Sequence, residues 1–351
     1  MSIVADAFTY VIGVDTHAKH HQYALLTTAT GQVLEQRSFP TSPAGLRRAL
    51  AWIQRRTTTG EVLVAVEGTG SYGRTLTGLL LTEEIAVTEV RPPTKTSRTR
   101  HGKTDQFDAA AAARLVLPAD ATTLAHPRQG PLRDALRCLT TARTQITKEK
   151  TACHNALTAL LRTSGLADAR TTPTMATIKT IAAWRTHPSD DLPTSIQRKH
   201  ATRLAKRILT LHDELRENEH DLTQLLHITA PRLLELPGIG PISAAIIIDA
   251  WSHPGRIHSE AAFAMLAGTA PLRIQSGNTD YHRLNKTGDR TLNSAIYRIA
   301  HTRIHHDPAT KTYYDKRAAM GHSHRHILRN LKRYITRQLF RHLTNNPPQL
   351  T

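Results

Sequence analysis

The chain has 351 residues, enough for two or three domains, and 46 Lys and Arg against 28 Asp and Glu give it a formal net charge of +18. This excess suits a polyanionic partner, because cationic side chains that neutralise phosphates release counterions and so drive binding. No apolar stretch approaches the ~18 residues of a membrane-spanning helix, and no signal-peptide pattern opens the chain, so we expect no membrane partner. Two cysteines cannot form a zinc knuckle or a disulfide framework. We therefore expect a cytoplasmic protein that is associated with the nucleoid when active.

The first region, residues 1–128, has the pattern of an α/β unit. Three strand-like runs open it: Tyr10–Asp15, Gln22–Thr28 and Gln32–Phe39. A helix follows, with Ser42 as its predicted N-cap. The apolar run Glu61–Val66 is then typical of a buried parallel strand, and a helix, a strand and a last helix complete the unit. Three meandering strands followed by alternating helices and strands predict an RNase H-like mixed sheet with helices.

The rest of the chain is predicted to be mainly helical. Residues 129–228 carry two apolar stripes at helical spacing, separated by the Thr-, Pro- and Asp-rich connection Thr171–Pro193. They predict an antiparallel helix pair or an oligomerising coiled coil of a dimer or tetramer, and the heptads are too irregular to choose. A third domain, residues 229–351, combines a helical start, a Gly- and Pro-rich stretch and a basic helical tail.

Four carboxylates lie at predicted ends of strands and helices in this α/β unit. They are Asp15, Glu67, Asp105 and Asp108. Asp15 and Glu67 end strands that lie side by side in such a sheet, and the other two are three residues apart on one helical face. Four such groups repel one another unless cations neutralise them, and oxygen ligands suit two Mg²⁺ ions, or Mn²⁺, that clamp a phosphodiester.

Each acid taken alone also has an ordinary structural explanation. Asp15 could form a turn after its strand, Asp105 could cap its helix, and Glu67 could be a solvated loop residue. Their joint placement on the expected elements of one fold favours the metal site.

The acidic segments VIGVDTHAKHH, VAVEGTGSYG and KTDQFDAAAAARL resemble the successive motifs of DEDD-type transposases of bacterial insertion sequences. That group is the insertion-sequence one-ten family, whose nuclease domain resembles Holliday-junction resolvases. The resemblance implies a RuvC-like DEDD nuclease domain over residues 1–128. It maps the four catalytic, metal-binding acids of the family onto the four carboxylates named above.

Two segments of the third domain suggest contacts with nucleic acid. ELPGIGPISAAII resembles a helix-hairpin-helix, in which the amides of Gly238 and Gly240 approach a backbone phosphate, although the same letters suit a simple turn between packed helices. Ser276 precedes a glycine, which by residue chemistry alone favours a turn. The resemblance instead implies that Ser276 is the nucleophile of a C-terminal transposase domain, forming a phosphoserine. Four cations surround it in sequence: Arg273, Arg283, Lys286 and Arg290.

The family resemblance also implies partners. Element-end and target DNA, a structured non-coding guide RNA encoded by the element, and a site shared between subunits of a homo-oligomer are expected. Two departures stand out: the region around Thr171–Pro193 does not align by eye, and Leu284–Arg290 is less basic than expected, which leaves the role of Asp289 open.

Three other functions compete with the recombinase. A Holliday-junction-resolvase-like nuclease would use the acids without the serine. A phosphotransferase of the sugar-kinase type shares the sheet but needs a small Gly-rich turn where this chain has the bulkier Thr16–Lys19. A non-catalytic DNA-binding scaffold would not need the acids at all.

Overall fold

The computed structural model describes residues 2–90, 105–128, 130–167, 171–276 and 279–350. The side chains of residues 105, 106, 276, 279, 280 and 282 lie outside this description. The chain forms two compact units, Met1–Gln129 with Ser252–Ala262 and Gly130–Trp251 with Phe263–Thr351. The division into three domains at 1–128, 129–228 and 229–351 stays a prediction. Among the described helices, none is long and apolar enough to cross a membrane.

A five-stranded mixed sheet organises the first unit, in the order β3-β2-β1-β4-β5. Its strands are β1 (Tyr10–Thr16), β2 (His20–Thr27), β3 (Val33–Pro40), β4 (Val62–Glu67) and β5 (Ala86–Val90). The first three strands pair antiparallel as a meander, and β1, β4 and β5 pair parallel. The mixed sheet and the helix-rich remainder of the chain confirm the predicted fold class.

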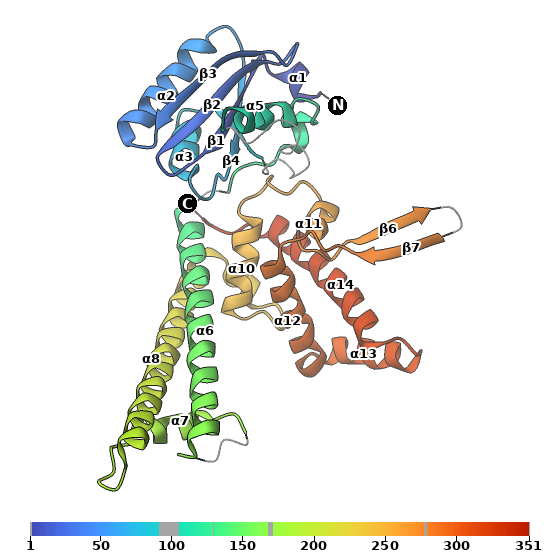
Figure 1. The fold of residues 1–351 in the computed structure, drawn as a ribbon. Helices are drawn as coiled ribbons and strands as arrows, with labels where there is room; N and C mark the ends of the chain where they lie inside the picture. The colour runs from blue at the N-terminus through green and yellow to red at the C-terminus, as the bar shows by residue number, and fades with distance from the viewer. Residues whose placement is uncertain (1, 91–104, 129, 168–170, 277–278, 351) are drawn as a thin grey trace. The chain divides into compact units, whose positions relative to one another are not determined.

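Helices cover both faces of this sheet (Figure 1). They are α1 (Val4–Ala7), α2 (Pro43–Arg56), α3 (Arg74–Thr82) and α5 (Asp105–Val116), followed by the short turn η1 (Ala121–Thr123). On one face, Ile12 and Val14 of β1 pack with apolar side chains of α2 and α3. On the other face, Val11 of β1 packs with Ala109 and Ala113 of α5. Both faces are buried, which is why β1 and β4 read as continuous apolar runs.

The second unit begins with two long helices that lie side by side (Figure 1). They are α6 (Pro131–Ser164) and α8 (Leu192–Thr229), joined through α7 (Met175–Ala182). The buried Asn218 of α8 donates a hydrogen bond of 3.0 Å to the carbonyl of Leu139 in α6, and Arg207 forms an ion pair of 2.9 Å with Glu149. The segment Thr171–Pro193, predicted as a connection, contains α7, whose buried Ile178 and Ile181 share a core with side chains of both long helices.

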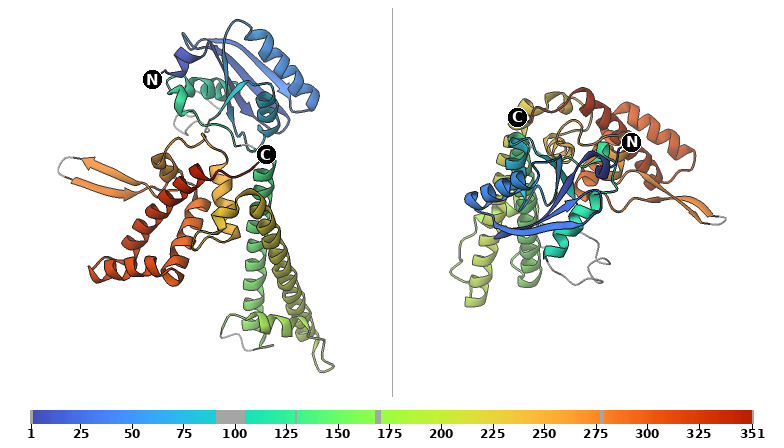
Figure 2. Two further views of the ribbon diagram at one scale, coloured as in Figure 1. Left: turned by 180° about the vertical axis from the view of Figure 1, so that it is seen from behind. Right: turned by 90° about the horizontal axis from the view of Figure 1, so that it is seen from above.

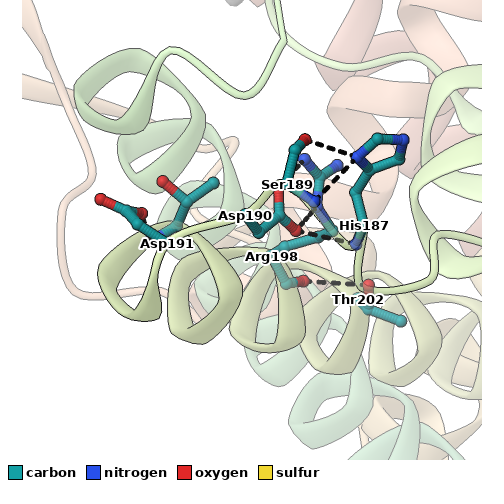
Figure 3. A network of polar contacts seen from close by, with 7 residues as sticks. His187, Ser189, Asp190, Asp191, Arg198 and Thr202 are labelled. Atoms are coloured by element: carbon teal, nitrogen blue, oxygen red, sulfur yellow. Dashed lines mark hydrogen bonds and ion pairs between the residues drawn. The ribbon is translucent and has the colours of Figure 1, made fainter.

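The turn that leads into α8 is held by a polar network around Asp190 (Figure 3). Arg198 donates two hydrogen bonds to the Asp190 carboxylate, at 2.7 and 2.9 Å, and the amide of His187 donates a third at 3.0 Å. The Arg198 contact, followed by that amide, lowers the pKa of Asp190 to about 2. The neighbouring Asp191 caps α8 by accepting from the amide of Thr194 at 2.9 Å.

The rest of the second unit includes the central helix α10 and part of α11, whose first three residues belong to the first unit. Its elements are α9 (Pro231–Leu234), α10 (Pro241–Trp251), α11 (Glu260–Leu266), β6 (Pro271–Ser276), β7 (Thr279–Leu284), α12 (Arg290–His306), α13 (Pro308–Ala319) and α14 (His324–Asn345). The side chains of α10 are apolar almost all round and nearly all buried, as expected of a central helix. The Gly- and Pro-rich stretch around Ser276 forms an antiparallel hairpin, β6 and β7, which extends away from the neighbouring helices (Figure 2).

Candidate catalytic carboxylates and nucleic-acid interface

Asp15 and Glu67 occupy adjacent strand ends in the first unit. In the parallel pairing of β1 with β4, Val14 lies opposite Val66, and the two acids are the residues that follow this pair. The hydroxyl of Thr16 donates a hydrogen bond of 2.8 Å to the carbonyl of Glu67, which ties the two ends together. The structure thus brings these two predicted site residues to one edge of the sheet.

Both acids belong to the face of the sheet that α5 covers. Side chains alternate along a strand, so Asp15 shares its face with Val11 and Gly13, and Glu67 shares its face with Ala65. Val11 and Ala65 belong to the core that includes α5. Asp15 is buried, with 7% of its surface exposed, so its carboxylate lies at the rim of that core rather than in an open loop.

The close approach of α5 to β1 depends on Gly13. A Cβ atom at Gly13 would lie 1.9 Å from the carbonyl oxygen of Ala109 and 2.6 Å from the amide nitrogen of Ala113. No side chain fits there, so the backbone of the helix rests directly on the strand. Glycine is required at this position because a side chain would clash with α5, and not because the backbone has a positive φ.

The direction of α5 places its first turn near the two acids. Leu117 directly follows the helix. Its carbonyl accepts a hydrogen bond of 3.3 Å from the amide of Ala5, and its side chain lies against Gly31 in the β2–β3 turn. Both contacts are at the end of the sheet where β1 starts. The opposite end of α5 therefore lies toward the end of β1. Asp108, in that first part of the helix, is 4% exposed. Asp105 begins the helix one turn earlier, and its side chain lies outside the described residues.

His17 in the β1–β2 turn contacts Asp15, and neither it nor its neighbour His21 in β2 was predicted as part of the site. Nε2 of His17 lies 2.9 Å from Oδ2 of Asp15. The amide of His17 donates to Nδ1 of the buried His21, and burial, reinforced by the charge of His17, lowers the pKa of His21 to about 4. His21 is therefore neutral at pH 7 and serves as an acceptor. In the sequence, only the histidine-rich HAKHH segment that follows Asp15 and Thr16 could have indicated this contact.

The donor chemistry of the carboxylates fits a hard divalent cation, because all their ligand atoms are oxygens. Among the side chains that the structure describes, no three His, Cys, Asp or Glu residues come close enough to hold a metal ion together. Asp15, Glu67 and Asp108 are all described, and the structure does not bring these three carboxylates within reach of one shared ion. The predicted set also includes Asp105, whose side chain lies outside the described residues.

The glycine turn before α10 is anchored on one side and open on the other. Gly238 has a positive φ of 72°, and a Cβ there would lie 3.0 Å from Cγ of Arg303. Arg303, almost fully buried, donates a hydrogen bond of 2.6 Å to the carbonyl of Pro237. Gly240 is exposed, with no atom within 4 Å of a Cβ position. Of the two predicted phosphate contacts, Gly240 is thus the one with an open approach.

The four cations that surround Ser276 in sequence are distributed over the hairpin, the segment after it and the start of α12. Ser276 is the last residue of β6, paired with Thr279. Arg273 pairs with His282 and Arg283 pairs with Leu272, so both cations belong to the strands. The exposed Lys286 follows the hairpin, and Arg290 is the first residue of α12. Asp289, whose role the sequence left open, caps α12 by accepting from the amides of Thr291 and Leu292.

Comparisons with known proteins match both units. The model of the DEDD transposase domain of IS110 elements matches residues 12–165, and the model described as Transposase IS116/IS110/IS902 family matches residues 230–315. The first match includes the four carboxylates and the second includes the glycine turn and Ser276. Together they span more than half of the chain, in the same order as the predicted regions. None of the curated proteins matches the chain.

Proposed function

The chain belongs to the IS110 family of DEDD transposases, and on this premise we propose that it excises and inserts its own insertion sequence by cutting and rejoining DNA strands. The observation that carries the proposal is the parallel register of β1 and β4, which places Asp15 and Glu67 side by side at the carboxyl edge of the sheet. Family membership makes a divalent cation the expected cofactor.

In this proposal Asp15, Glu67, Asp105 and Asp108 are the metal ligands. Two bound Mg²⁺ or Mn²⁺ ions would supply electrostatic stabilisation of the attacking and leaving oxygens of a phosphodiester. The task of the protein is to hold the carboxylates rigidly. The contact of α5 with Gly13 and the hydrogen bond from Thr16 to the Glu67 carbonyl support that rigidity. His17 orients the Asp15 carboxylate through the contact at its Oδ2 atom.

Ser276 is proposed as the nucleophile. Its Oγ attacks a DNA phosphorus and loses its proton, a bond between serine oxygen and phosphorus forms, and the bond to one deoxyribose oxygen breaks. That deoxyribose oxygen takes up a proton. A hydroxyl of the second DNA strand then attacks the phosphoserine, and the serine recovers its proton. Because the phosphodiester energy is conserved in the intermediate, rejoining needs no ATP.

The proposal extends to the partners that the family resemblance implies. A homodimer or homotetramer combines the acids of one subunit with Ser276 of another, and a structured non-coding RNA selects element-end and target DNA. The net charge of +18 supports contact with such polyanions. The open side of Gly240 and the cations Arg273, Arg283, Lys286 and Arg290 are proposed backbone contacts, and the protein acts in the cytoplasm at the nucleoid.

Conservative substitutions test the two halves of the site separately. Asp15→Asn and Glu67→Gln should each reduce recombination in a donor–target plasmid assay by about 100-fold or more, because each removes a charged ligand of the cations that would stabilise the transition state. Glu83→Gln, at an exposed acid after α3, is the matched control. Recombination that survives both site substitutions would overturn the nuclease role and favour a non-catalytic scaffold.

The serine is tested by its covalent product. Ser276→Ala should remove the protein–DNA adduct seen on denaturing gels, while Ser294→Ala, an exposed serine of α12, should retain it. Strand cleavage without any adduct in the unmodified protein would favour the Holliday-junction-resolvase-like nuclease. An adduct that persists in Ser276→Ala would assign the nucleophile elsewhere.

A further inference from the structure

A pocket of about 250 Å³ lies at the foot of the β6–β7 hairpin, within the second unit. The approach to β6, residues 268–271, forms one wall, the end of β7 forms another, and α14 forms the third. The volume is below the roughly 300–1,000 Å³ of sites that enclose a drug-sized ligand. It therefore suits a small group that enters from outside rather than a whole enclosed ligand.

Basic side chains line the pocket. They are Arg283 from β7 and His326, Arg329, Lys332 and Arg333 from α14. None of the described residues that line it is acidic, and no described carboxylate forms an ion pair with Arg283, Arg329 or Lys332. A concave surface with cations of one sign and low-dielectric walls focuses the field on an anion.

The cation at the back of this pocket, Lys332, is held in place by hydrogen bonds. Its Nζ donates a bond of 2.9 Å to Oδ1 of Asn293, and Nδ2 of Asn293 donates one of 2.7 Å to the carbonyl of Ala267. The fully buried Thr336 hydroxyl lies 3.0 Å from that of Thr269, so α14 is also bonded to the wall opposite.

The cations of this pocket repel one another. Burial, and then the neighbouring charge of Arg329, lowers the pKa of Lys332. The half-buried Lys332 and the exposed Arg329 beside it repel each other, and a bound anion would relieve that repulsion. The cluster is thus suited to a ligand.

We propose that this pocket binds a phosphate of a nucleic-acid backbone, with Arg283, Arg329 and Lys332 as its principal contacts. Arginine and lysine donors around a small concavity match the charge and the acceptor oxygens of a phosphodiester. The inference rests on the proposed function, which supplies a nucleic-acid partner, and adds a defined backbone contact on α14, a helix that the sequence marked only as part of a basic tail.

The contact positions the strand and takes no part in the chemistry. Ser276 is five residues beyond Pro271 along β6, a distance of about 17 Å at the rise of an extended strand. Phosphates of one strand of a duplex are spaced about 3.4 Å along its axis. The bound phosphate is thus several nucleotides from one that reacts at the hairpin tip, so the pocket fixes the register of the strand on the hairpin.

The salt dependence of binding tests the pocket. Affinities for a DNA duplex, a DNA single strand and a folded RNA are measured by fluorescence anisotropy in EDTA, so that no strand transfer contributes. Arg329→Gln should reduce the slope of log affinity against log salt by about 0.9 for the duplex or about 0.7 for a single strand. The nucleic acid that shows the change identifies the backbone bound. Arg325→Gln, an exposed arginine of the same helix outside the pocket, is the matched control and should leave the slope unchanged.

Two results would overturn this inference. One is an unchanged slope for Arg329→Gln with all three nucleic acids, and the other is an equal reduction in Arg325→Gln, which would mean diffuse surface attraction. Because Arg329 is exposed, the variant should fold, and circular dichroism checks this. Failure of the proposed function is a separate result, since loss of the catalytic role of Asp15 or Ser276 would not change binding in EDTA.

Discussion

Replacing Gly13 by alanine should move the helix that carries two of the proposed metal ligands. The new Cβ would meet the Ala109 carbonyl at 1.9 Å, whereas ordinary contacts are at 3.4–4 Å. The helix α5 must therefore retreat from β1 by about 1.5 Å, the difference between these distances. Both neighbouring atoms belong to the backbone, so no side chain can rotate out of the way.

The size of the effect follows from overpacking of a closed contact. Such changes cost about 1–3 kcal/mol, and we expect about 3 kcal/mol here because the backbone has to shift. For a unit of this size that predicts a fall in Tm of about 10 °C. A misplacement of about 1 Å at a reacting site can also cost about 100-fold in rate, so recombination should fall with the displacement of Asp108.

Thermal unfolding by circular dichroism and recombination measured well below Tm give the two readouts. Gly78→Ala is the matched control, because this helical glycine of α3 has no atom within 4 Å of its Cβ position and should gain about 0.5–1 kcal/mol. A Gly13→Ala protein with unchanged Tm would refute the close contact. Full activity in a destabilised Gly13→Ala protein would refute the link between α5 and catalysis.

Three further predictions concern stability. Burial lowers the pKa of His21 to about 4 in the folded protein, so as the pH falls below 6.5 the unfolded state binds a proton at this histidine before the folded state does. The free energy of unfolding in urea should therefore decrease from pH 6.5 to 4. His21→Gln should make that decrease smaller. Arg133→Ala should cost about 3–5 kcal/mol by urea denaturation, because it leaves Asp249 without the buried cation it pairs with, and Arg133→Met should cost less. Asn218→Ala should lower the thermal stability of the α6–α8 pair by about 1–3 kcal/mol, because the carbonyl of Leu139 loses its buried donor.

Much of the first unit could be predicted from local sequence pattern. Continuous apolar runs marked β1 and β4 as strands buried on both faces, and Ser42 caps α2 as its position before Pro43 indicated. The strand order followed because a meander and then alternating helices restrict how a sheet can be assembled. Asp15 and Glu67 came directly after such runs, so their adjacent placement could be expected before any coordinates.

Contacts between distant segments were decided only by tertiary structure. Nothing local distinguishes Gly13 from any other glycine, since its role is to admit the backbone of a helix about a hundred residues later. The helix α7 within an expected connection buries Ile178 and Ile181 in a core that it shares with α6 and α8. The basic pocket needs Asn293 to hold Lys332 beside the start of β6. Hydrophobic periodicity indicates which side of a local helix or strand is buried. It does not indicate which distant segment packs against that side, and this is what the tertiary structure determines.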